Sequence, residues 1–433
     1  MEPQSPAPRP PALPPPNGTG VPPASPGTPA SAGSANPGAS VPPGSPAGGK
    51  PPQAVPFGVN EIRLGARQWL AVLALVGLIA GLTPRVWERV ERFQTGPDYR
   101  IPYSLSKDYW LYDRRLRQAA TPEKVLLLGD SVVWGEYVAP DGTLSHFLNR
   151  QAEVADRFIN GGLNGLFPLA QEGLLRYYGG ALRHRKLILQ CNVLWLTSPK
   201  ADLSTGKEEQ FNHARLVPQF WPRIPCYRAD ANQRLSAVIE RHAPFVAWVD
   251  HLQDAYFGQK SILSWTLEDD GASPPCYPNA WKNPLSQIKF AVPCAPQEDP
   301  DRGPGSPRHK PWSGTARFDW VDLDASLQWG AFQRLLAMLR HRDNQVLVLL
   351  GPFNEHMIVR ENRPAFRKVR DGIAAWLAGQ RIAHVVPETL PSELYADASH
   401  PLTDGYRLLA QRLYQDPAFR GWLEGQQASL PRP

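Results

Sequence analysis

Short, mostly apolar runs, each followed by a glycine, a proline or a polar turn, restrict the fold of this chain most strongly. The first run covers residues 125–128 and ends at Gly129, Asp130 and Ser131. A strand without polar alternation is buried on both faces, which is typical of a parallel sheet. Similar runs predict further strands at residues 157–160, 186–195, 345–350 and 382–386. The sequence therefore predicts a five-stranded parallel sheet.

Segments with apolar residues at helical spacing separate these strands. They cover residues 143–155, 169–182, 327–340, 364–378 and 402–413. Strands that alternate with helices predict an α/β domain whose sheet is covered on both faces. We assign residues 123–199 and 325–425 to the two parts of this domain, and residues 88–122 to a linker before it.

Residues 200–324 interrupt the domain with a long insertion rich in proline and tryptophan, in which residues 232–256 have helical character. Exposed tryptophans on loops could stack on sugar rings. They could equally form the small core of an inserted subdomain. The residues concerned are Trp221, Trp248, Trp265, Trp281, Trp312 and Trp320.

The N-terminal residues 1–60 consist mostly of proline, glycine, serine and alanine. Such a composition cannot bury enough apolar surface to offset chain entropy, so we expect a disordered tail. The formal net charge of +6 comes mainly from scattered arginines. Without a long Lys/Arg block, the sequence gives no reason to expect nucleic acid as a partner.

An uncharged stretch of 17 residues lies between Arg67 and Arg85. At about 1.5 Å per residue a helix of this length spans roughly 26 Å, which is adequate for a bilayer. Trp69 and Trp87 stand where interfacial aromatic residues are found. The stretch predicts a membrane anchor at residues 66–87, with a buried core helix or a signal peptide as alternatives. Basic residues flank both ends, so charge does not determine its orientation.

The chain has four cysteines. Cys191 ends an apolar run and is expected in the core. Cys226, Cys276 and Cys294 lie in the insertion, where a Cys276–Cys294 disulfide would be the easiest to close and would suit an oxidising compartment. No Cys/His spacing typical of a metal site occurs. We expect neither a metal nor an organic cofactor.

Two polar motifs follow predicted strands at opposite ends of the domain. Ser131 follows the first strand, and Asp397 and His400 follow the last one. Open α/β sheets place their chemistry at the carboxyl ends of the strands. There, His400 could take the proton of Ser131 while Asp397 orients the imidazole. We therefore hypothesise a serine nucleophile with a His/Asp pair.

With these motifs the sequence resembles the SGNH/GDSL hydrolase family from Lys124 to about Leu413, the insertion excepted. Gly129, Asp130 and Ser131 are similar to the nucleophile block of the family. Residues 160–165 resemble its Asn-x-Gly-x-x-Gly turn, and residues 397–406 its Asp-x-x-His-Pro ending with Gly-Tyr. In the third block Gln190-Cys191-Asn192-Val193 replaces the usual Gly-x-Asn-Asp.

The resemblance implies a three-layer α/β/α, flavodoxin-like fold. It implies Ser131, Asp397 and His400 as catalytic residues, with an oxyanion held by the N–H groups of Ser131 and Gly165 and by the Asn192 amide. The altered third block makes Asn192 the weakest of these assignments.

An SGNH domain behind one membrane helix is similar to the membrane-bound members that add or remove acetyl groups on cell-surface polysaccharides, the alginate-acetylation proteins among them. This implies a single-pass membrane protein with an extracytoplasmic, or periplasmic, domain and a cytoplasmic tail. The expected function is an esterase or O-acetyltransferase acting on an acetylated carbohydrate, within a polysaccharide-modification machinery. The alternatives are a lipid esterase or thioesterase, and a non-catalytic polysaccharide-binding component.

Overall fold

A five-stranded parallel sheet forms the centre of the folded unit, with strand order β2-β1-β3-β4-β5. The computed structural model describes residues 64–210, 212–268, 281–292, 311 and 313–425. The α/β class and the five parallel strands expected from the sequence are confirmed. The strands are β1 (Val125–Gly129), β2 (Phe158–Gly162), β3 (Lys186–Cys191), β4 (Gln345–Leu350) and β5 (Ala383–Val385).

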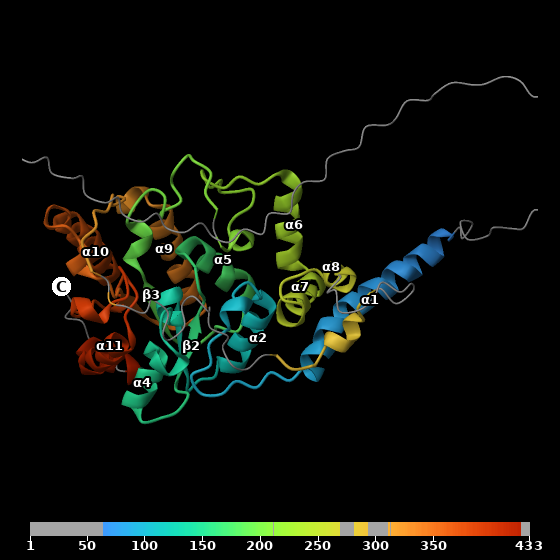
Figure 1. Cartoon of the computed structure of the whole chain (residues 1–433), viewed down its shortest axis with the longest axis horizontal. Coiled ribbons are helices and arrows are strands. Elements are labelled where there is room, and N and C mark those ends of the chain that lie inside the picture. Colours follow the sequence, from blue (N-terminus) through green and yellow to red (C-terminus); the bar gives the residue numbers. More distant parts are fainter. Residues whose placement is uncertain (1–63, 211, 269–280, 293–310, 312, 426–433) are drawn as a thin grey trace, which may run out of the picture. The chain divides into compact units, whose positions relative to one another are not determined.

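Helices cover both faces of the sheet because successive side chains of each strand point to opposite sides. Leu126 and Leu128 belong to one apolar core, and Val125 and Leu127 belong to another. Figure 1 shows α5 and α9 on one side of the strands and α4 and α11 on the other. The first core takes residues from α2 (Tyr109–Ala119), α5 (Pro168–Tyr178), α9 (Leu327–His341) and α10 (Arg363–Gly379). The second takes residues from α3 (Ser131–Trp134), α4 (Leu144–Ala152), α11 (Thr403–Gln415) and α12 (Pro417–Leu423).

Short 3-10 turns connect these elements. They are η2 (Tyr103–Leu105), η3 (Pro140–Gly142), η4 (Val193–Leu196), η5 (Ala214–Leu216), η6 (Pro284–Gln287), η8 (Leu323–Ala325), η9 (Glu355–Met357), η10 (Arg360–Asn362) and η11 (Ser392–Leu394).

The segment 88–122, expected to be a linker, is part of the folded unit. It contains η2 and α2, and Leu111 and Leu116 of α2 are fully buried. The apolar pattern of α2 is interrupted in the sequence by arginines, which we took for exposed residues. Two of them, Arg114 and Arg115, are in fact buried. Arg114 forms a 2.6 Å ion pair with Glu91, and Arg115 lies over the ring of Tyr99.

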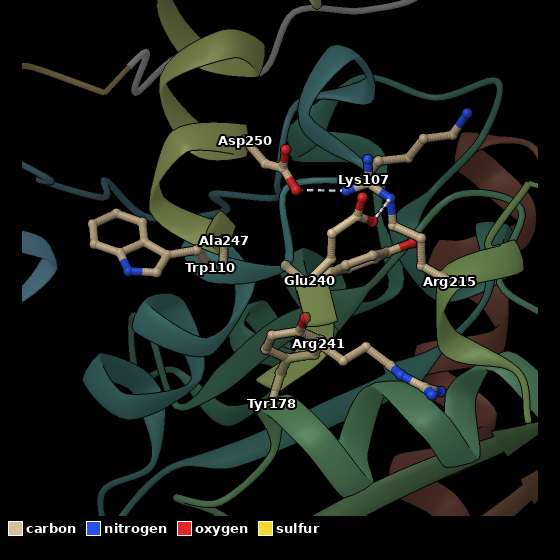
Figure 2. A pocket seen from close by; sticks show the side chains of 9 residues that line it. Lys107, Trp110, Tyr178, Arg215, Glu240, Arg241, Ala247 and Asp250 are labelled. Atoms are coloured by element: carbon tan, nitrogen blue, oxygen red, sulfur yellow. Dashed lines mark hydrogen bonds and ion pairs between the residues drawn. The ribbon is translucent and has the colours of Figure 1, made fainter. Parts of the chain in front are cut away.

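The insertion contains three helices in its described part, α6 (Ala231–His242), α7 (Pro244–Tyr256) and α8 (Ile262–Leu267). Arg215 connects the first two, because its guanidinium pairs with Glu240 of α6 at 2.8 Å and with Asp250 of α7 at 2.6 Å. Figure 2 shows this bridge beside a small cavity.

The structure divides the tryptophans of the insertion into packed and exposed ones. Trp248 and Trp265 pack into a small core of the insertion with Phe257, and Trp320 packs against the main core. Trp221 and Trp281, in contrast, are exposed. Trp312 lies outside the described residues.

One helix of the described residues, α1 (Ala66–Val90), is long and apolar enough to cross a membrane. The most apolar part of α1 has a mean hydropathy of 1.8 and is almost entirely exposed. Its C-terminal end, in contrast, packs against the insertion, where the ring of Trp87 contacts that of Trp248 at 5.5 Å. The helix is therefore attached to the folded unit rather than solitary.

A buried ionic cluster strengthens this attachment. The imidazole of His251 on α7 lies between the carboxylates of Asp108, at 2.6 Å, and Glu91, at 3.0 Å. Burial alone would lower the pKa of His251, but the two carboxylates raise it to about 9. The charged imidazole thus joins the residue after α1 to α2 and α7.

Two of the four cysteines lie within the described residues, and both are buried free thiols. Burial raises the pKa of the Cys191 thiol, as it does that of Cys226. The expected Cys276–Cys294 disulfide and the N-terminal tail of residues 1–60 lie outside the described residues.

Candidate active site

Ser131 stands at the carboxyl end of β1, where the strand order reverses between β2 and β3. Such switch points are where open α/β sheets bind ligands. Asp130 caps the short helix α3, because its Oδ1 accepts the N–H of Val132 at 2.9 Å. Ser131 is the first residue of α3, and its side chain is therefore placed at the edge of the sheet.

The structure brings Ser131, His400 and Asp397 together in one relay. Ser131 Oγ lies 2.8 Å from His400 Nε2, and His400 Nδ1 lies 2.8 Å from both carboxylate oxygens of Asp397. The backbone N–H groups of Ser399 and His400 donate to Asp397 Oδ1 at 2.9 and 3.0 Å. A hydroxyl, an imidazole and a carboxylate in this order can generate a serine nucleophile.

Charge around the imidazole favours its protonated form. Burial alone would lower the pKa of His400, but the carboxylates of Asp397 and Glu136 raise it to about 9. Burial would conversely raise the pKa of Asp397, and the facing imidazole together with the two backbone N–H groups holds it below its usual range. The imidazole is therefore mostly protonated below about pH 9, and the neutral form, which could take the proton of Ser131, predominates above that pH.

Glu136 is a site residue that sequence reasoning missed. Its Oε2 lies 3.3 Å from His400 Nε2, the same nitrogen that contacts Ser131, and its side chain is buried. Its backbone N–H donates to the carbonyl of Ser131 at 3.0 Å. The turn after α3 therefore returns a second carboxylate to the imidazole. A glutamate in a polar turn gave no sequence pattern that could reveal this.

We expect Glu136→Gln to move the low-pH limb of ester turnover toward neutral pH by about one unit, because a nearby carboxylate stabilises the imidazolium by an amount of that order. Catalysis by Ser131 would require neutral His400, so a pKa near 9 predicts a rate for the unchanged chain that rises with pH up to that region. Removing the charge lowers the pKa and extends activity downward. A kcat/KM profile between pH 5 and 10 for both chains measures the shift; superimposed profiles would show that Glu136 does not act on His400.

The predicted Asn-x-Gly-x-x-Gly turn packs directly against α3. Asn160 Nδ2 donates to the carbonyl of Val133 at 2.9 Å. A Cβ atom on Gly162 would lie 2.3 Å from the backbone nitrogen of Trp134, so only glycine permits this approach. The carboxyl end of β2 is thereby fixed to the turn that carries Ser131.

Gly165 lies at the end of the same turn in a left-handed conformation, with φ of +67°. His213 of the insertion supports the turn, because its Nε2 donates to the carbonyl of Asn164 at 2.9 Å and its Nδ1 accepts the hydroxyl of Tyr109 at 2.9 Å. Burial lowers the pKa of His213 to about 4, which keeps it neutral in this role. Sequence reasoning missed both supports, because one lies in the insertion and the other in the supposed linker.

Asn192 lies beside the site, and its side-chain amide already donates one hydrogen bond to Asp130. Its Nδ2 donates to Asp130 Oδ2 at 2.8 Å, and Trp195 Nε1 donates to the same oxygen at 2.9 Å. Since an amide nitrogen carries two hydrogens, one of them is left for an oxyanion. The altered third block thus still places an amide beside Asp130, the residue that precedes Ser131.

Two further side chains hold the loop after Ser131. Arg100, fully buried, donates to the carbonyls of Trp134 at 3.1 Å and Val138 at 2.9 Å, and its guanidinium lies 4.0 Å from the Trp134 ring centre. Tyr406 on α11 donates to the carbonyl of Val132 at 2.6 Å. Arg100 was missed because it lies in the supposed linker, whereas Tyr406 belongs to the fourth block.

The described residues line a small cavity and a larger cleft, and neither lining includes Ser131, Asp397 or His400. The one in Figure 2, between α2, α6 and α7, measures about 10 Å³ and holds no more than one water molecule. A larger cleft of about 510 Å³ runs along α5 and is bordered by the loop that carries Phe220 and Trp221. Trp221 is 87% exposed at its edge, and the cleft is also lined by Arg176, Arg241 and Arg334.

No family model matches the chain, and a search of curated proteins returns no significant match.

Proposed function

We propose that this chain is a serine-dependent ester hydrolase or O-acyltransferase of the SGNH/GDSL type. The observation that carries the proposal is the relay from Ser131 through His400 to Asp397, with 2.8 Å at each contact. The strand order β2-β1-β3-β4-β5 is that of flavodoxin-like sheets and supports the SGNH assignment.

The proposed reaction has two stages, acylation of Ser131 and transfer of the acyl group to an acceptor. Ser131 Oγ attacks the acyl carbonyl while its proton passes to His400 Nε2. The carbon–oxygen bond to the alcohol then breaks, and His400 protonates the leaving oxygen. A water molecule or a sugar hydroxyl next attacks the acyl-serine and gives its proton to His400. The bond between the acyl carbon and Ser131 Oγ then breaks, and His400 returns the proton to Ser131 Oγ. Asp397 stays ionised and stabilises the imidazolium.

The oxyanion of each tetrahedral intermediate would be held by the N–H groups of Ser131 and Gly165 and by the remaining Asn192 hydrogen. Loss of one such donor typically costs about 3–4 kcal/mol of transition-state stabilisation. The packing of the Gly165 turn against α3 supports this assignment, because it keeps both backbone donors at the same sheet edge.

The proposed substrate is an acylated, most simply acetylated, cell-surface carbohydrate. The cleft along α5 supports this proposal, because exposed Trp221 offers a flat apolar ring. Arg176 and Arg334 pair with Glu172 in the cleft, and their remaining N–H groups offer donors for sugar hydroxyls. Helix α1 supports a single-pass anchor, and we propose that the catalytic domain is extracytoplasmic. A polysaccharide-modification machinery is the proposed setting.

We expect Trp221→Ala to raise KM for a polymeric or oligosaccharide acceptor about fivefold, since stacking on an exposed aromatic ring contributes on the order of 1 kcal/mol. Turnover of p-nitrophenyl acetate, which is too small to need the cleft, stays unchanged. Trp281→Ala is the matched control, because Trp281 is also exposed but does not line the cleft. Equal effects of the two variants would exclude the cleft as the carbohydrate site.

The experiment that tests the proposal measures p-nitrophenyl acetate turnover by the full-length chain in detergent, with and without a free oligosaccharide. The full chain is required because Trp87 and Glu91 tie the end of α1 to the folded unit. Acetate alone among the products indicates an esterase, and acetyl on the sugar indicates a transferase. Preference for long-chain esters or thioesters would favour a lipid esterase. A folded chain without turnover or acyl-enzyme would favour a polysaccharide-binding component.

A further inference from the structure

An apolar patch lies on the surface of the insertion near the end of α1. Its members come from α8, from η6 and from the residues that flank η6, and each is at least 42% exposed. They are Leu263, Leu267, Trp281, Leu285 and Phe290. Leucines this exposed are common singly, but a group of them on neighbouring elements indicates an interaction surface.

Helix α8 presents apolar residues on both of its faces. Ile262 and Trp265 turn inward to the small core of the insertion, where Trp265 meets Phe257 edge to face at 5.2 Å. Leu263 and Leu267, one helical turn apart, form the outward face and are 69% and 64% exposed. The inner residues already anchor the helix, so the outer leucines are not needed for its own packing.

The patch is joined to α1 by direct contacts. The ring of Phe290 packs on that of Trp87 at 5.0 Å. The N–H of Arg92 donates to the carbonyl of Phe290 at 2.9 Å, and the N–H of Val292 donates to the carbonyl of Arg92 at 3.0 Å. The patch therefore continues the apolar surface of α1 at its C-terminal end.

The length of α1 places this end at the bilayer surface. Its 25 residues span about 37 Å at a rise of ~1.5 Å, whereas the hydrocarbon layer is about 30 Å thick. The last turns, with Trp87 and Arg89, then lie among the lipid headgroups. Exposed Lys289 borders the patch, and lysine stems commonly lie along apolar surface with the amine toward headgroups.

We propose that this patch is a membrane-docking surface that inserts into the interfacial layer of the bilayer crossed by α1. The inference rests on the membrane anchoring proposed above. Continuity with α1 favours lipid over a second protein as the occupant, since a protein partner would have to share the surface with the bilayer. Docking by α8 and η6 in addition to α1 would hold the folded unit at a fixed orientation on the membrane.

The test uses the full-length chain in nanodiscs of phosphatidylethanolamine and phosphatidylglycerol, with the photo-crosslinker benzoylphenylalanine in place of single apolar residues. Leu285, 74% exposed in η6, and Leu263 probe the patch. Leu78 of α1 probes the anchor. Val154, 49% exposed after α4, is the control for an apolar residue elsewhere on the surface. Mass spectrometry after illumination identifies the crosslinked molecule.

We expect lipid adducts at positions 78, 263 and 285, at least fivefold above the yield at position 154. Lipid at 78 without lipid at 263 and 285 would overturn the docking surface and leave the anchor intact. No lipid at 78 would overturn the anchor itself. Crosslinks from 263 or 285 to a second copy of the chain or to another protein would overturn the proposal and identify that protein as the occupant of the patch.

Discussion

Replacing Ser131 by alanine is expected to lower ester turnover by about 10⁴- to 10⁶-fold, to the level supported by binding and oxyanion contacts alone. The reason is that no other hydroxyl in the relay contacts His400 Nε2 at bonding distance among the described residues. Steady-state turnover of p-nitrophenyl acetate measures the loss. The substitution removes one oxygen from a buried position and leaves α3 and its Asp130 cap in place.

Ser399→Ala is the matched control for this experiment. Ser399 is also buried and lies between Asp397 and His400 in the chain, but only its backbone N–H contacts these residues, by donating to Asp397. Its hydroxyl has no hydrogen-bond partner within the described structure. We expect near-normal turnover from this control. Retained turnover in Ser131→Ala would assign the activity to another nucleophile.

Replacing Asp397 by asparagine is expected to lower kcat/KM by about 10⁴-fold, because an amide can hold the wrong tautomer of His400 and cannot stabilise the imidazolium. The pKa of His400 should also fall, since the Asp397 carboxylate is one of the charges that raise it. The residual activity of the variant therefore persists to lower pH than that of the unchanged chain. Kinetics across pH 5 to 10 measures both effects.

The same substitution has a consequence for stability. The raised pKa of His400 stabilises the fold below the ordinary histidine pKa of about 6.5, and this contribution disappears as pH rises through about 9. The difference in unfolding free energy between the two chains should consequently be larger at pH 6 than at pH 10. Asp404→Asn, an exposed carboxylate on α11, should change neither rate nor stability appreciably. An equal loss in both variants would contradict the assignment of Asp397.

The sequence predicted the sheet well because buried parallel strands are unbroken apolar runs. The expected bounds of β4 agree with the structure, and those of β5 differ by one residue at each end. The third strand was expected to extend to residue 195, but β3 ends at Cys191 and η4 follows, because apolar side chains continue into a turn that is also buried. Periodicity alone does not distinguish these two structures.

The relay was predictable because Ser131, Asp397 and His400 carry recognisable motifs at strand ends. Its supports were not, because Glu136, Arg100 and His213 act through contacts that only the folded chain creates. Arg100 and α2 were assigned to a linker because a sequence does not distinguish a buried arginine from a solvent-exposed one. The C-terminal packing of α1 was likewise hidden, as its partners lie in α7 and near Phe290.

The most direct test of the central claim is covalent labelling of Ser131 by a fluorophosphonate, followed by mass spectrometry of the intact chain and its peptides. A single adduct on Ser131, formed faster as pH rises toward 9 and reduced at least a hundredfold by His400→Ala, is the predicted result. A folded, full-length chain that stays unlabelled, or that carries the adduct on a different residue, would contradict the proposed serine mechanism.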